Sequence, residues 1–180
     1  MGVSFRLVLA LAAAATTAGC FQPMYSQQPA TIGSPAVAAA LESVDVQQIA
    51  APNGTDDARI GVELRNDLLF GLQGGNGGGS PTHSLKIRVF GSRATTSVDL
   101  QTGRSSTDIY TLTASYEMTD LRTDKIVLKD RSVAPVSYDT PGEQQRFARA
   151  RALREAEDRA AQLLADSIKS RLASFFVAGS

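Results

Sequence analysis

Residues 108–118, "DIYTLTASYEM", carry a period-two pattern of apolar and polar side chains. Successive side chains of a β-strand point to opposite faces of a sheet, so the pattern assigns every second residue to one face. The apolar face holds Tyr110, Leu112, Ala114, Tyr116 and Met118. The opposite face holds Thr111, Thr113, Ser115 and Glu117. The pattern therefore predicts a strand that is buried on one side, in a sheet whose other side is polar.

A second strand is expected at residues 84–90, "SLKIRVF", where Leu85 and Ile87 alternate with Lys86 and Arg88. The two cations would then stand on the polar face of the sheet. They fit either a face exposed to solvent or a surface that contacts lipid phosphates, because cationic side chains pair with phosphate oxygens. The solvent-exposed face is the favoured interpretation, because cations exceed carboxylates by only two over residues 81–138.

Two more strands complete the expected sheet. Residues 41–49, "LESVDVQQI", alternate Val44 and Val46 with polar residues. Residues 126–138 form the last strand, and Pro135 near its end indicates an edge position or a bulge, because proline cannot donate a ladder hydrogen bond. Turns are predicted at 101–104, "QTGR", and at 120–125, "DLRTDK".

Two segments have helical periodicity. One starts beside Asp56 and Asp57, which favour a helix N-terminus, and carries an apolar face. That face consists of Ile60, Leu64, Leu68 and Leu72. The other runs from Glu143 to Phe176 without proline or glycine, and its apolar residues follow helical spacing. The predicted fold class is α+β, a two-layer sandwich in the order β-α-β-β-β-α, with a four-stranded sheet and two helices on one face.

The N-terminus has the features of a secretion signal. Arg6 precedes an apolar stretch at residues 7–15, "LVLALAAAA", which is too short to span a bilayer. Small residues then lead to Cys20, the single cysteine of the chain. The segment "TAGC" resembles a bacterial lipobox, with Thr17 at the position where leucine is usual. Residues 1–19 are therefore expected to be a lipoprotein signal peptide and Cys20 the lipid attachment site; the alternative is an unmodified cysteine after an ordinary signal peptide.

The predicted domain organisation follows from this signal. Residues 20–40 contain three prolines among Gln, Ser and Ala, and read as a lipidated tether with little regular structure. Residues 41–180 are expected to form a single domain. Phe21 follows the cysteine where Asp would retain an enteric lipoprotein in the inner membrane, so the expected location is the periplasmic side of the outer membrane.

Several classes of function find no support in the sequence. The net charge is zero, which gives no electrostatic argument for nucleic acid. His83 is the single histidine, so neither a metal site nor a Ser-His-Asp triad is expected, and no cofactor is predicted. The segment "GGNGGGS", residues 74–80, lacks the Lys-Ser/Thr of a phosphate-binding loop. Glu155, Glu157 and Asp158 lie among arginines and are expected to form surface ion pairs.

The ordered set of segments resembles a known family, that of the LPS-assembly lipoprotein LptE in its alphaproteobacterial form. The segments that carry the resemblance are "GCFQPMY" (19–25), "LRNDL" (64–68), "YTLTASYEMTD" (110–120), "DKIVL" (124–128), "SYD" (137–139) and "EAEDRAAQLLADSIKSRL" (155–172). The resemblance implies a non-enzymatic outer-membrane lipoprotein. Its implied partner is the LptD β-barrel, whose lumen it plugs, and its implied ligand is lipopolysaccharide (LPS) on the way to the outer leaflet.

The family resemblance also implies where the ligand binds. Basic residues near the hairpin after the second strand and near the start of the last helix contact the ligand in this family. The regional matches here are Arg93 and Arg104 for the hairpin and Arg146 for the helix start. An auxiliary lipoprotein of an ABC-type lipid transporter is a second hypothesis that the sequence does not separate from the first, and a periplasmic enzyme ranks last.

Overall fold

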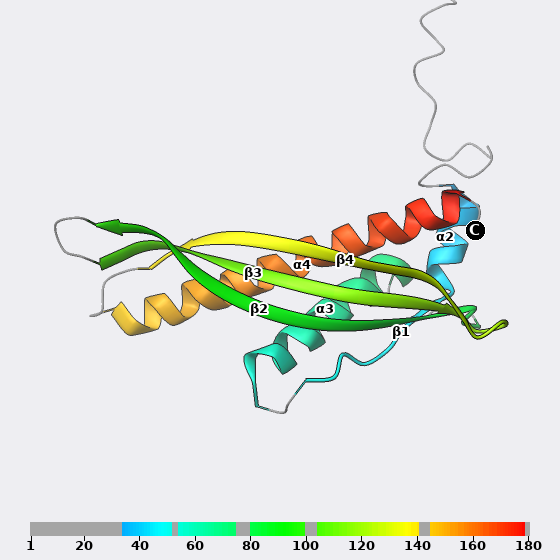
Figure 1. Ribbon diagram of the computed structural model, residues 1–180, viewed down its shortest axis with the longest axis horizontal. Coiled ribbons are helices and arrows are strands. Elements are labelled where there is room, and N and C mark those ends of the chain that lie inside the picture. The colour runs from blue at the N-terminus through cyan, green and yellow to red at the C-terminus, as the bar shows by residue number, and fades with distance from the viewer. Residues whose placement is uncertain (1–33, 52–53, 75–79, 100–103, 141–144, 179–180) are drawn as a thin grey trace, which may run out of the picture.

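The central strand of the sheet is β3 (Arg104–Asp120), and its predicted apolar face is buried throughout. The computed structural model describes residues 34–51, 54–74, 80–99, 104–140 and 145–178, with the side chains of 97–99 and 104–106 outside that description. Within it, β1 (Val44–Val46), β2 (His83–Asp99), β3 and β4 (Lys125–Asp139) form one sheet in the order β1-β2-β3-β4 (Figure 1). β1 pairs parallel to β2, and the other pairs are antiparallel. The predicted edge position of Pro135 is confirmed, since β4 ends the sheet.

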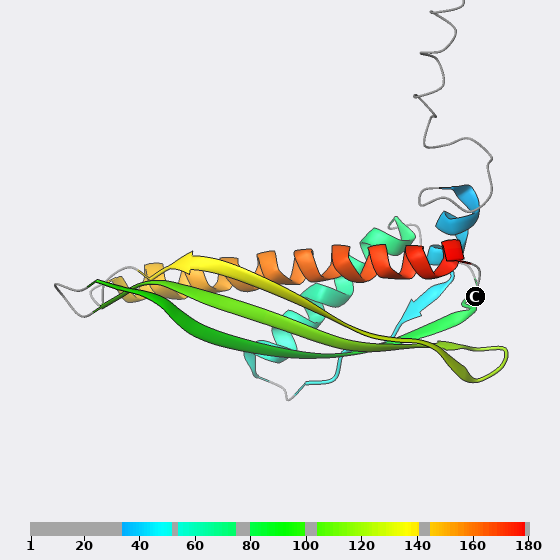
Figure 2. The ribbon, with the colours of Figure 1, turned by 45° about the horizontal axis from the view of Figure 1, so that its top comes forward.

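Helices α3 (Asp56–Gln73) and α4 (Arg146–Ala178) cover one face of this sheet, as Figure 2 shows. The Thr55 side chain accepts a hydrogen bond from the Ala58 N–H at the start of α3, beside the predicted Asp56 and Asp57. Gly74 ends α3 in the left-handed conformation, with φ of 62°, which glycine adopts without steric cost. α3 also makes the crossover that a parallel β1–β2 pair requires. The predicted two-layer α+β fold is therefore confirmed.

The core lies between the sheet and the two helices. The predicted apolar face of α3 is buried, and α4 contributes a row of small and branched residues that pack against β3, β4 and α3. The buried residues of α4 include Ala156, Ala160, Leu164, Ile168 and Leu172. Alanines at this interface let the long helix approach the strands closely. No helix of the described residues covers the opposite face of the sheet.

One element differs from the sequence-based prediction. Residues 35–40 were expected to belong to a tether with little regular structure and 41–49 to a strand, whereas Pro35–Glu42 form helix α2 and the strand is limited to Val44–Val46. Ser34 caps this helix by accepting a hydrogen bond from the Val37 N–H, and proline at the first helical position suits its fixed φ. Alanine, the strongest helix former, occupies half of the segment. Val37 and Leu41 are buried and attach α2 to the core.

The β2–β3 hairpin is longer than predicted, because each of its strands has 17 residues. The additional pairs involve Ser- and Thr-rich segments in which no apolar alternation marks a strand, and their register shifts between Thr95 and Ser97. The predicted turn at 101–104 lies mostly outside the described residues. The hairpin forms one end of the elongated molecule, and α2 lies at the other end, beside the C-terminal end of α4 (Figures 1 and 2).

Candidate functional site

The predicted site residue Arg93 lies on the helix-covered side of the sheet. It stands opposite Tyr110 in the β2–β3 register, in line with Leu85 and Ile87. Its guanidinium is 3.4 Å from the Asp56 carboxylate and 3.7 Å from that of Glu157. About half of the side chain remains exposed. Arg93 therefore belongs to an ion-paired cluster that joins β2 to both helices.

Glu157 is the centre of that cluster. It is buried, with 1% of its surface exposed, so the expectation that it forms a surface ion pair is wrong. Its partner is Arg59 of α3, whose guanidinium bonds Glu157 at 2.5 Å and Asp158 at 2.6 Å. Burial raises the pKa of Glu157, and the bond from Arg59 opposes that rise. Sequence patterns could not reveal this pair, because its partners lie on different helices, 98 positions apart.

Tyr110 packs beside this cluster. Its hydroxyl is buried and has no hydrogen-bond partner among the residues that the structure describes, and burial raises the pKa of Tyr110 to about 12. Gly91, opposite Leu112 on β2, leaves the space into which this hydroxyl projects. A Cβ at position 91 would lie 2.3 Å from the Tyr110 oxygen, so no larger residue fits without movement.

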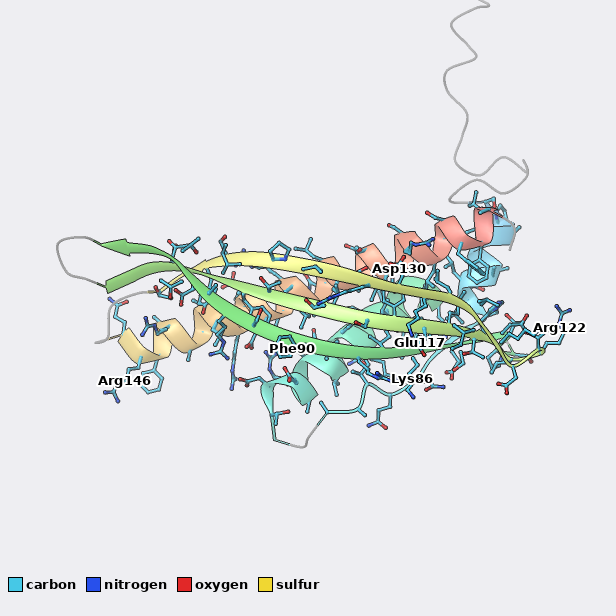
Figure 3. All side chains as sticks on the ribbon, viewed as in Figure 1. Lys86, Phe90, Glu117, Arg122, Asp130 and Arg146 are labelled. Atoms are coloured by element: carbon cyan, nitrogen blue, oxygen red, sulfur yellow. The ribbon has the colours of Figure 1, made fainter. Side chains whose placement is uncertain are left out.

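The two other predicted arginines lie toward the hairpin end of the molecule. Arg146 begins α4 and is exposed, and Figure 3 places its side chain at the outer end of that helix. Arg104 begins β3 and pairs with Asp99 in the hairpin; its side chain is outside the described part of the structure. The structure therefore does not gather the three arginines into one described site. Cys20 also lies outside the described residues.

The polar side of the sheet, termed here the open face, carries two basic rows. Lys86, Glu117 and Lys129 stand side by side across β2, β3 and β4, and Arg88, Ser115 and Arg131 form the next row. All four cations are exposed. Figure 3 shows Lys86 and Glu117 projecting from neighbouring strands. The prediction that Lys86 and Arg88 share the polar face is confirmed.

Charge is incompletely balanced in these rows. Lys129 bonds Glu117 at 2.8 Å, and this bond holds the pKa of Glu117 below its usual range. Lys86, Arg88 and Arg131 form no ion pair with any residue that the structure describes. Asp45 lies in the adjoining row, opposite Ser84. Four cations therefore face two carboxylates.

Apolar side chains follow directly along the same face. Phe90 and Val133 flank Thr113 in the third row, and they are 65% and 53% exposed. Pro135 continues the apolar surface in the fourth row, beside Thr111. The open face thus combines a basic half with an apolar half. The sequence analysis identified Lys86 and Arg88 but missed this arrangement, because the partners on β4 depend on the strand register.

The described residues offer neither a cluster of metal ligands nor a membrane-spanning helix. No group of three or more His, Cys, Asp or Glu side chains there could hold a metal ion. Among the same residues, no helix has the length and apolar character needed to cross a bilayer.

Comparison with known proteins gives the family. The sequence pattern of LptE, described as lipopolysaccharide-assembly, matches residues 41–172, which is most of the chain. The chain belongs to the LptE family. This membership supports a role in the assembly of lipopolysaccharide. No curated protein sequence matches the chain.

Solved structures share the fold. A Caulobacter crescentus CB15 protein assigned as a lipoprotein is similar with a TM-score of 0.59 at 22% identity, over 80% of this chain and 97% of the other. Rare lipoprotein B from Shewanella oneidensis is similar with a TM-score of 0.52 at 14% identity, over 74% of this chain and 96% of the other. At these identities the likeness extends to the fold.

Proposed function

We propose that this LptE-family protein is an outer-membrane lipoprotein that assembles with an LptD-like β-barrel and assists delivery of lipopolysaccharide to the outer leaflet. The observation that carries the proposal is the family match over residues 41–172. The role is that of a structural subunit without catalysis. Its partners are the barrel, lipopolysaccharide and the membrane that holds the lipid anchor.

The shape of the domain supports a position inside a barrel. The molecule is elongated, with the β2–β3 hairpin at one end and α2 at the other (Figure 1). Thr111, Thr113 and Ser115 give the middle of the open face short polar side chains, which suit a wet lumen. Helices α3 and α4 cover the opposite side and give the domain a second surface that could meet the barrel wall.

The anchor is proposed at Cys20, with residues 1–19 removed as a signal peptide. A lipoprotein that carries three acyl chains is held firmly, because each buried CH₂ contributes about 0.8 kcal/mol. Cys20→Ser is expected to abolish lipidation and to leave the precursor unprocessed or the protein soluble. Mass spectrometry of the mature N-terminus measures this directly, and a mature terminus at Phe21 or Gln22 without lipid would contradict the proposal.

Contact of Arg93, Arg104 and Arg146 with lipopolysaccharide stays a prediction. Arg104 and Arg146 share the hairpin end of the molecule, whereas the ion pairs of Arg93 give it a structural role as well. Charge reversal at Arg93 would add a third carboxylate beside Asp56 and Glu157 and destabilise the fold. The clean test is therefore Arg104→Glu with Arg146→Glu, which should weaken binding of purified lipopolysaccharide at low salt without changing the unfolding transition.

Co-purification tests the assembly itself and separates the two function hypotheses. The full chain, with an affinity tag at its C-terminus, is extracted from membranes of the bacterium in mild detergent and its partners are identified by mass spectrometry. We expect a large outer-membrane β-barrel in stoichiometric amount. Recovery of an inner-membrane ATPase complex in place of a barrel would favour the alternative, an auxiliary lipoprotein of an ABC-type lipid transporter.

A further inference from the structure

The open face of the sheet has two halves of different chemistry within reach of each other. Side chains two residues apart on one strand lie about 7 Å apart, and neighbouring strands lie about 5 Å apart. Lys86, Arg88, Lys129 and Arg131 therefore surround an area of roughly 7 by 10 Å. Phe90 and Val133 begin one row further along. An anionic group and an apolar chain of the same molecule could occupy both halves together.

The basic half is suited to phosphate. Arg88 and Arg131 occupy the two ends of one row, with the small Ser115 between them. Guanidinium groups bind phosphate oxygens in a bidentate manner, and a serine between them leaves room for the anion. A shallow hollow lies beside Arg88 and Ser115 and extends over the neighbouring row, with Lys86, Glu117 and Lys129 also in its lining. Because Lys86, Arg88 and Arg131 form no ion pair in the described structure, their charge is available to a ligand.

The apolar half argues against a face that meets only water. Single exposed apolar side chains are common on protein surfaces, but here Phe90, Val133 and Pro135 lie in adjoining rows of one face. An acyl chain that covered them would remove apolar surface from water, at about 25 cal/mol per Å². A water-soluble phosphate would use the basic rows alone and leave this surface uncovered.

We propose that the open face is a binding surface for a phosphate-bearing glycolipid, whose phosphates contact Lys86, Arg88 and Arg131 and whose acyl chain lies on Phe90 and Val133. The inference rests on the proposed function, which supplies lipopolysaccharide as the ligand, and assigns that ligand to a surface other than the hairpin end. Glu117 is ion-paired with Lys129 at 2.8 Å, so this carboxylate beside the hollow already has a cation of its own. Asp130 does not oppose the anion, because it pairs with Arg171 of α4.

A charge-matched pair of variants tests the basic half. Lys86→Gln/Arg88→Gln/Arg131→Gln removes three charges from the open face, and Arg151→Gln/Arg154→Gln/Lys169→Gln removes three exposed charges from α4. The full chains are purified in detergent and their binding to purified lipopolysaccharide is measured at low and at high salt. We expect the open-face variant to bind at least about tenfold more weakly at low salt and the α4 variant to change less than about twofold. Equal affinities of the two variants would overturn the proposal.

Removing the phosphates tests the same contact from the ligand side. Lipopolysaccharide whose lipid phosphates have been cleaved off should bind the wild type more weakly and should no longer distinguish it from the open-face variant. Phe90→Thr with Val133→Thr should weaken binding of the acylated ligand while leaving the unfolding transition in place, since both side chains are exposed. If dephosphorylated lipopolysaccharide still bound the wild type more tightly than the open-face variant, the assignment of the phosphates to the basic rows would be contradicted. Unchanged affinity of the threonine variant would contradict the apolar half.

A photoreactive amino acid at Thr113, in the middle of the open face, identifies the occupant in living cells. The control position is Asn66, which is exposed on α3. A cross-link from Thr113 to lipopolysaccharide that is absent at Asn66 supports the proposal. A cross-link from Thr113 to the barrel protein overturns it, while leaving the proposed function intact. Co-purification of the barrel with the wild type and with the open-face variant separates the two failures. If the wild type does not recover the barrel, the proposed function is refuted. If both proteins recover the barrel, a failed binding test counts against the open-face assignment alone.

Discussion

Arg59 offsets the cost of burying the Glu157 carboxyl group, because its hydrogen bond and charge oppose the rise in pKa that burial causes. An ionised carboxylate without a partner in a protein interior costs several kcal/mol, and a close cation offsets most of that cost. The guanidinium bonds both Glu157 and Asp158 and so ties α3 to α4. Arg93 approaches the second oxygen of Glu157 from β2. The cluster joins the three elements at the place where the helices meet the sheet.

Replacing Arg59 should therefore destabilise the fold. Arg59→Met keeps much of the apolar stem and removes the charge, and we expect a loss of about 1–3 kcal/mol, less than for a fully buried pair because Arg59 is partly exposed. Adding Glu157→Gln to that variant should restore part of the loss, since the uncompensated charge is then gone. Urea unfolding of the wild type, both single variants and the double variant measures the coupling. Strict additivity of the two changes would contradict an energetic link between them.

Gly91 makes a second prediction at this scale. Gly91→Ala should destabilise the protein by about 1–3 kcal/mol, because the new methyl group overlaps the buried Tyr110 hydroxyl. Adding Tyr110→Phe to Gly91→Ala should recover part of the lost stability, because it removes the hydroxyl oxygen that the new methyl group overlaps. The recovery should be partial, because two ring carbons would still lie 3.0 and 3.2 Å from the Cβ at position 91. Tyr110→Phe alone should be close to neutral, because no described residue forms a hydrogen bond with the hydroxyl. Thermal unfolding gives all three values, and a stable Gly91→Ala variant would show that β2 and Tyr110 do not approach this closely.

Among the secondary-structure elements, α4 holds the edge strand β4 through an ion pair as well as through the core. Arg171 donates a hydrogen bond of 2.6 Å to Asp130, and this bond is the main reason that the pKa of Asp130 lies below its usual range. A carboxyl group whose pKa is lower in the folded state stabilises that state above its unfolded pKa, near 3.9. The contribution disappears as the pH falls through the lower, folded value.

The variant Asp130→Asn tests this contribution of the Arg171–Asp130 ion pair to stability. We expect the variant to be less stable than the wild type by roughly 0.5–1 kcal/mol at neutral pH, a modest effect because solvent screens both partners. The difference should shrink as the pH falls below about 4, where the wild-type carboxyl also loses its charge. Lys169→Gln on the same helix is the control. A difference in unfolding free energy that does not change with pH would mean that lost packing, and not charge, explains the variant.

The same elements show how far the sequence determines the fold in advance. Period-two alternation placed β3 and its buried face correctly, and four-residue spacing did the same for α3, because burial on one side imposes those repeats. Helix α2 was missed although Ser34-Pro35 and the alanines that follow are a helix start, since the prolines upstream favoured a tether. The partner of Glu157 and the pairing of Phe90 with Val133 across Thr113 depend on the tertiary arrangement and the strand register. Neither contact can be predicted from a pattern of neighbouring residues in the sequence.

For the molecule as a whole, one face of the sheet packs against the core and the other is exposed. One face holds the core and both long helices, and the other keeps charged and apolar side chains available. The described chain begins at the end where α2 and the C-terminal end of α4 lie, opposite the hairpin (Figure 2). The hairpin therefore lies at the end opposite the first described residue, Ser34. The open face then runs along the length of the molecule between the two ends.

Arrival of newly made lipopolysaccharide at the cell surface tests the proposed role most directly. The chromosomal copy is placed under a repressible promoter in the bacterium that encodes it, and surface lipopolysaccharide is measured with an antibody on intact cells during depletion. We predict that new surface lipopolysaccharide falls several-fold while it accumulates inside the envelope, and that the wild-type chain restores it. Surface lipopolysaccharide that stays at its normal level throughout depletion would contradict a role in its delivery to the outer leaflet.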